Sequence, residues 1–268
     1  MTAAGKVETL AAGGIAPSGG SFDRHGASDH RFYFRLAAFF VLLAFGGFVP
    51  TYWLRVIDGS VNLPPLIHIH GLLFFAWTLF YLFQTGLVAY GRTPSHRAWG
   101  MAGIALFTTM ICTALAGRIA NMQIDEARGF GDAGRRFAIF TFFDAVTLPV
   151  LFALAIIHVR RREWHKRFMV ALGIAMLPPA VARLFLTISG ATPGGPPPPV
   201  IFGLAPNLLT YFLLFLIPVL HDWRRVGRVH PIYLCAAAWL MIGKSLMIPF
   251  AATEAWLRAA GALQHIAG

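Results

Sequence analysis

Seven long apolar stretches are the feature that most constrains the fold of this chain. They cover residues 33–54, 65–90, 98–121, 137–158, 166–189, 200–220 and 231–252. The hydrocarbon core of a bilayer is about 30 Å thick, and a helix needs about 20 apolar residues to cross it. The sequence therefore predicts an all-α fold, a polytopic bundle of seven transmembrane helices within residues 32–252.

The composition supports this class of protein. Of the 268 residues, 57% are hydrophobic and 12% are charged, whereas soluble domains carry about 25% charged residues. A net charge of +11 would suggest nucleic-acid binding in a soluble protein. In a membrane protein, however, Lys and Arg accumulate in cytoplasmic loops. We therefore expect the lipid bilayer as the partner, and no nucleic acid.

The distribution of Lys and Arg predicts the orientation. With the N-terminus inside, the inner side receives fourteen of these residues and the outer side receives six. This bias favours an inside N-terminus and an outside C-terminus, in a bacterial cytoplasmic (inner) membrane. Residues 1–31, rich in Gly, Ala and Ser, are predicted to be a disordered cytoplasmic tail. Residues 253–268 are predicted to form a short amphipathic segment, with Trp256, Ala260 and Leu263 on one face.

Four ionisable residues lie well inside the predicted spans: His70, Asp144, Arg183 and Lys244. Such residues are costly in a bilayer and usually face the bundle interior, so they are candidates for function. The topology places all four in the outer half. The alternative is that Asp144, Arg183 and Lys244 take part in a buried ion pair that only fixes helix packing.

His70 shares a helix face with two other polar or aromatic residues. Trp77 and Gln84 follow it at i+7 and i+14, and we include both among the candidate cofactor-binding residues, with the four ionisable ones. His68, two residues earlier, lies about 200° round the helix. The two histidines are therefore not expected to serve one site. The alternative for His70 is a helix-to-helix hydrogen bond.

A second layer of histidines gathers at the predicted inner boundary: His96, His158, His165, His221 and His230. Basic and aromatic residues surround them, as is typical of interface anchors. His96 and His165, together with His70, are the candidate haem ligands. The two cysteines lie in apolar runs and have no metal-binding spacing.

Three motifs resemble a bacterial membrane-protein family, domain of unknown function 2306. They are "HGLLFFAWTLFYLFQ" (His70 to Gln84), "HRAWG" (His96 to Gly100) and "HKRFMVALGIAMLPPAVARL" (from His165). The resemblance covers roughly residues 65–190. It implies a helical membrane core of about four helices and implies no particular activity.

Three functions remain open on these residues. The first is membrane redox chemistry with b-type haem or quinone, which needs inward histidines and Arg or Lys for anionic groups, with other membrane redox proteins as partners. The second is a proton-coupled transporter or permease using Asp144. The third is a non-catalytic scaffold or assembly factor. A retinal Schiff base on Lys244 lacks any supporting motif, and the sequence does not predict an oligomeric state.

Overall fold

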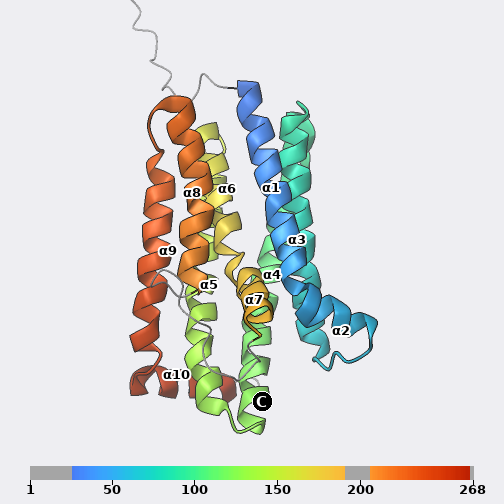
Figure 1. The fold of residues 1–268 in the computed structure, drawn as a ribbon, viewed down its shortest axis with the longest axis vertical. Coiled ribbons are helices and arrows are strands. Elements are labelled where there is room, and N and C mark those ends of the chain that lie inside the picture. Colours follow the sequence, from blue (N-terminus) through green and yellow to red (C-terminus); the bar gives the residue numbers. More distant parts are fainter. Residues whose placement is uncertain (1–25, 191–205, 266–268) are drawn as a thin grey trace, which may run out of the picture.

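The computed structural model describes residues 26–190 and 206–265, and every regular element in these ranges is helical. The predicted all-α class is therefore confirmed. Long helices run side by side along one axis (Figure 1). The elements are α1 (Gly26–Phe48), η1 (Val49–Trp53), α2 (Leu54–Ile57), α3 (Pro65–Ala89), α4 (Thr93–Ala127), α5 (Gly131–Ile157), α6 (Arg162–Ala175), α7 (Pro178–Ser189), α8 (Pro206–Val226), α9 (Pro231–Phe250) and α10 (Glu254–His265).

Within residues 26–190 and 206–265, six helical stretches are long and apolar enough to cross a membrane. They are Asp29–Ile57, Pro65–Ala89, Thr93–Ala127, Gly131–Ile157, Arg162–Ser189 and Pro231–Phe250. α8 is not among these six, and its last turns carry His221, Asp222, Arg224 and Arg225. The first residues of the predicted span 200–220 lie outside the described ranges. α8 nevertheless runs beside α9 and packs on α7 and α9 (Figure 1).

The fifth predicted span, residues 166–189, is divided into two helices. α6 ends at Ala175 and α7 begins at Pro178. Two consecutive prolines, Pro178 and Pro179, lack the backbone N–H groups that a continuous helix would need, and their rings clash with the preceding turn. Both segments still belong to one membrane-length stretch, which is broken near its middle.

α6 forms the centre of the core. Val170, Ala171, Leu172 and Ile174 are all fully buried, and α6 packs on α1, α5, α8 and α9. The opposite surfaces of the outer helices are apolar and exposed, with Leu42 71% and Leu72 68% exposed. An apolar core inside an apolar outer surface is the pattern expected of helices in hydrocarbon.

The two ends of the chain differ from the bundle. α1 begins at Gly26, so residues 26–31 of the predicted tail are helical, and residues 1–25 lie outside the described ranges. α10 lies across the end of the bundle (Figure 1) and contacts α4 and α5. Trp256, Ala260 and Gln264 are the buried residues of α10, whereas Leu263, predicted to share a face with the first two, is half-buried. The Trp256 indole donates to the Arg135 carbonyl at 2.8 Å.

Candidate functional site

The paired histidines of α3 point to different neighbours. His68 Nδ1 lies 2.8 Å from the Tyr52 hydroxyl of η1. His70 Nδ1 lies 3.4 Å from the Thr113 hydroxyl of α4. The predicted separation of the two rings is therefore present, and His70 makes a helix-to-helix contact.

Asp144 and Lys244 form an ion pair between α5 and α9. Lys244 Nζ lies 2.6 Å from Asp144 Oδ1, and the side chains are 6% and 27% exposed. Nζ also donates to the Phe140 carbonyl at 3.3 Å and lies 5.2 Å from the centre of the Phe143 ring. Tyr211 of α8 is fully buried, and its hydroxyl has no hydrogen-bond partner in the described part of the chain. The pair is therefore held in mostly apolar surroundings.

Arg183 lies apart from this ion pair. Its guanidinium donates to the Pro179 carbonyl at 2.9 Å and lies 4.3 Å from the centre of the Phe48 ring. No acidic side chain of the described ranges forms an ion pair with it. Of the four ionisable candidates of the outer half, Asp144 and Lys244 pair with each other, while His70 and Arg183 each have other partners, and the contacts do not gather the four into one site. A quinone held jointly by His70 and Arg183 gains no support from this arrangement.

Trp77 and Gln84 occupy the buried face of α3. Trp77 is 4% exposed and packs on Phe107 and Phe152, with ring centroids 5.1 and 5.6 Å away. The Gln84 side-chain oxygen is buried, and no described group hydrogen-bonds to it. Trp77 is therefore a packing residue of the core.

His96 of α4 and His165 of α6 face each other. Their ring centroids are 6.2 Å apart, and the ring planes are 74° apart. His165 Nδ1 lies 2.8 Å from the Ala155 carbonyl. Because a carbonyl only accepts, Nδ1 carries the hydrogen, and Nε2 of the neutral ring is left with a free lone pair.

The His96 ring has an unsatisfied nitrogen. Its Nδ1 is buried and has no hydrogen-bond partner among residues 26–190 and 206–265, while the ring also faces the Gln84 backbone carbonyl. Gly100 follows one turn later on α4, and a Cβ added there would meet no atom within 4 Å. The two rings therefore offer nitrogen lone pairs that no described residue uses.

The other histidines at this end have different contacts. His158 Nδ1 lies 2.8 Å from the Leu154 carbonyl, and its ring stacks on Trp164 at 5.1 Å. His221 stacks on Phe32 at 3.6 Å. His230 caps α9 by accepting from the Ile232 N–H at 3.4 Å. Burial, with a smaller contribution from Arg167, lowers the pKa of His230 to about 4.

A buried ionic network at the same end was not predicted as a site. Arg167 is 1% exposed and makes two bonds to Asp222, at 3.0 and 2.7 Å. It also pairs with Glu163, which in turn lies 2.7 Å from Lys166. Lys166 and Arg167 were counted with the basic loop residues. The sequence signal was Glu163 at i+3 and i+4 from two basic residues, a helical ion-pair spacing.

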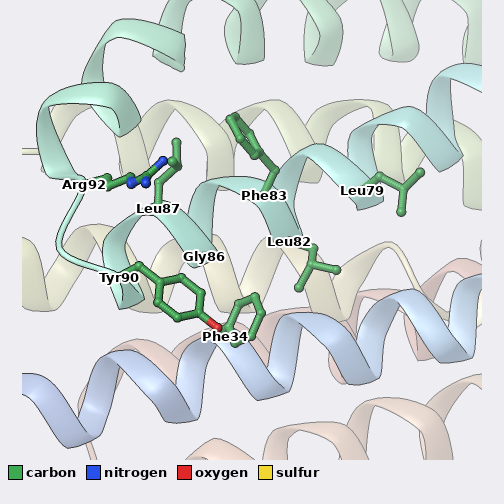
Figure 2. Close-up of a pocket in the computed structure, with 8 residues that line it drawn as sticks. All are labelled: Phe34, Leu79, Leu82, Phe83, Gly86, Leu87, Tyr90 and Arg92. Atoms are coloured by element: carbon green, nitrogen blue, oxygen red, sulfur yellow. The ribbon is translucent and has the colours of Figure 1, made fainter.

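An open groove lies elsewhere, between α1 and α3 (Figure 2). It measures about 650 Å³, and mostly apolar side chains line it, with Arg92 and Tyr90 near one end. Its lining contains none of the candidate residues named from the sequence. Leu79, Phe83 and Tyr90 are exposed, so in a bilayer the groove faces lipid.

No family model, curated protein or solved structure matches this chain. The resemblance of residues 65–190 to the family named above stays a prediction, and function has to be argued from the side chains alone.

Proposed function

We propose that this chain is a membrane redox protein that binds one b-type haem between His96 and His165. The observation that carries the proposal is the opposed pair itself, with ring centroids 6.2 Å apart and a buried nitrogen of His96 without a partner. His96 and His165 would each supply one ring nitrogen to the haem iron.

The hydrogen bond of His165 fits the same role. Haem in a helical bundle is held by side chains from facing helices, and α4 and α6 supply one histidine each. Metal-binding histidines usually donate their other ring N–H to a carbonyl, which fixes the tautomer and orients the ring. His165 makes this bond to the Ala155 carbonyl.

The number of ligands argues for haem over a bare metal ion. Within the described ranges, no three His, Cys, Asp or Glu side chains gather in a metal-binding group. A closed zinc site needs four ligands, whereas haem iron needs only two from the protein.

Positive charge lies near the proposed site. Arg92 and Arg97 flank His96 in sequence, are exposed and form no ion pair with an acid of the described residues. Guanidinium groups bind carboxylates strongly, so these two arginines would hold the propionates. When bound, haem supplies one-electron transfer; this chain would orient the rings and, through the core around α6, exclude water.

The proposed topology is seven spans with the N-terminus inside, in a bacterial inner membrane. α8 would be the seventh crossing, supported by its packing between α7 and α9. The His96 and His165 end carries most of the Arg and Lys of the helix junctions, among them Arg160, Arg161, Arg224 and Arg228. The positive-inside bias would place this end in the cytoplasm, where another membrane redox protein could exchange electrons.

The test is a reduced-minus-oxidised absorption spectrum of detergent-purified protein expressed with haem supply. We expect Soret and alpha bands in the wild-type protein and in His70→Ala, and loss of these bands in His96→Ala and His165→Ala. Circular dichroism of each variant establishes that the helices are retained. A folded, colourless wild-type protein, or bands that survive both inner substitutions, contradicts the proposal.

A proton-coupled transporter is the second candidate, favoured by the buried ion pair of Asp144 and Lys244 beside the unpartnered Tyr211 hydroxyl. It predicts pH-gradient-driven flux of a small solute into liposomes, abolished by Asp144→Asn. If neither colour nor flux is found while Asp144→Asn lowers thermal stability, the pair is structural and the scaffold function is favoured.

A further inference from the structure

A basic cleft between α1 and α8 has no role in the haem proposal. It measures about 340 Å³ and is lined by Arg31, Phe32 and Arg35 of α1 and by His221 and Arg225 of α8. Three of its five lining side chains are arginines, a fourth is a histidine, and none is acidic. The first turns of α1 and the last turns of α8 meet at the same end of the bundle (Figure 1).

The cleft has an excess of positive charge. Arg31 and Arg35 are exposed and form no ion pair with any acid in the described part of the chain. Asp29, whose side chain is 8% exposed, lies 3.5 Å from Lys166, 3.4 Å from His221 and 3.7 Å from Arg225. This buried carboxylate is therefore already shared between Lys166 and Arg225, and the two outer arginines have no counter-ion among the described residues.

The walls of the cleft are fixed by packing. The Phe32 and His221 rings stack with centroids 3.6 Å apart and planes 2° apart. This contact holds the start of α1 against the end of α8 and sets the spacing of the arginines on either side. A preorganised cluster of cations loses less conformational entropy on binding an anion than flexible loop residues do.

The surface next to the cleft is apolar. Phe39 and Leu42 follow Arg31 and Arg35 on the same face of α1, and they are 38% and 71% exposed. A molecule with an anionic head and hydrocarbon chains would place its head between the arginines and its chains along this face. Arginine pockets between helices at a membrane boundary bind anionic lipid headgroups in this way.

We infer that the cleft formed by Arg31, Arg35, His221 and Arg225 binds the phosphate of one anionic phospholipid from the bilayer, with its acyl chains along Phe39 and Leu42. The inference rests on the membrane location of the helices and not on the haem proposal. A free phosphate ion shares the headgroup chemistry but would gain nothing from the apolar face.

Native mass spectrometry and thermal unfolding of the full chain test this inference. The probes are phosphatidylglycerol, phosphatidylcholine and inorganic phosphate. We expect wild-type protein to retain one phosphatidylglycerol, to gain thermal stability from it, and to respond little to the other two. The Arg31→Gln/Arg35→Gln variant should bind phosphatidylglycerol roughly thirtyfold more weakly, which corresponds to about 2 kcal/mol for the two lost cations.

The matched control is Arg160→Gln/Arg161→Gln, which removes two exposed arginines from the same end and should bind like the wild-type protein. Equal weakening in both variants would indicate a general charge effect and overturn the inference. Protection by inorganic phosphate alone would overturn the lipid assignment. The two proposals can fail separately. A variant that loses the haem absorption bands but still retains phosphatidylglycerol contradicts neither the lipid site nor its independence from haem, and a variant that loses the lipid but keeps the bands shows that the lipid site is separate.

Discussion

Lys244 Nζ lies 2.6 Å from Asp144 Oδ1, in an ion pair that joins the middle of α5 to α9. Removing one partner of a buried pair leaves the other charge uncompensated, which is the costly step. We expect Asp144→Ala to lower the free energy of unfolding by about 3 kcal/mol, as measured by denaturation in mixed micelles.

The double variant Asp144→Leu/Lys244→Met distinguishes packing from function. Apolar residues of similar volume often replace a buried ion pair at little cost, so we expect this variant to recover most of the lost stability. If the double variant is as unstable as Asp144→Ala, the two charges also interact with other groups, and their role is not limited to neutralising each other. Solute flux that disappears in the stable double variant would favour the transporter.

The pairing of Arg167 with Asp222 gives a second prediction. A bidentate guanidinium contact in a buried site cannot be reproduced by an ammonium group. We expect Arg167→Lys to cost at least about 2 kcal/mol of stability. Arg162→Lys, the same change at an exposed position five residues earlier, should stay within about 0.5 kcal/mol of the wild-type protein. Equal effects of the two substitutions would contradict a special role for the buried contact.

The fold was predictable because hydrocarbon imposes length and polarity on every helix that crosses it. Predicted spans 65–90 and 231–252 differ little from α3 and α9. The break between α6 and α7 falls at Pro178 and Pro179, where the missing backbone N–H groups interrupt a continuous helix. α8 has polar residues in its last turns and is not among the six membrane-length stretches found in the described part of the chain.

The candidate site was only partly predictable. Helical periodicity predicted that His68 and His70 point in different directions, because both residues lie on the same helix. It could not show that Asp144 meets Lys244 rather than Arg183, or that His96 meets His165, because those contacts depend on the packing order of different helices. Arg167 was missed because a buried arginine beside a basic loop has the same sequence pattern as an interface anchor.

His230 predicts a dependence of stability on pH. Burial, with a smaller effect of Arg167, lowers the pKa of His230 to about 4 in the folded chain, against about 6.5 for an unfolded histidine. Between these values the unfolded chain binds more protons, so this contribution to stability is complete above pH 6.5 and is lost as the pH falls toward 4. Protonation also removes the acceptor that caps α9.

The measurement is the midpoint of unfolding at pH 7.5 and at pH 5. His230→Asn keeps a good helix-capping side chain and cannot titrate. We expect the difference between the two midpoints to be smaller in this variant than in the wild-type protein. An unchanged difference would assign the pH dependence to other groups.

Two adjacent glycines of α1 give the final prediction. A Cβ added at Gly47 would overlap the backbone of Ala180 in α7, including its carbonyl group, whereas one added at Gly46 would meet nothing within 4 Å. Small residues permit such close approach between membrane helices. We expect Gly47→Ala to separate α1 from α7 and to destabilise the protein by about 1–3 kcal/mol, the usual cost of overpacking. Gly46→Ala adds the same atom to the same helix without the overlap, and should be neutral or slightly stabilising because alanine favours helix.

Thermal unfolding of the two variants makes the comparison directly. Since helix propensity changes equally at both positions, any difference between their melting temperatures reports the contact with Ala180. Equal melting temperatures would show that the two helices can separate without cost.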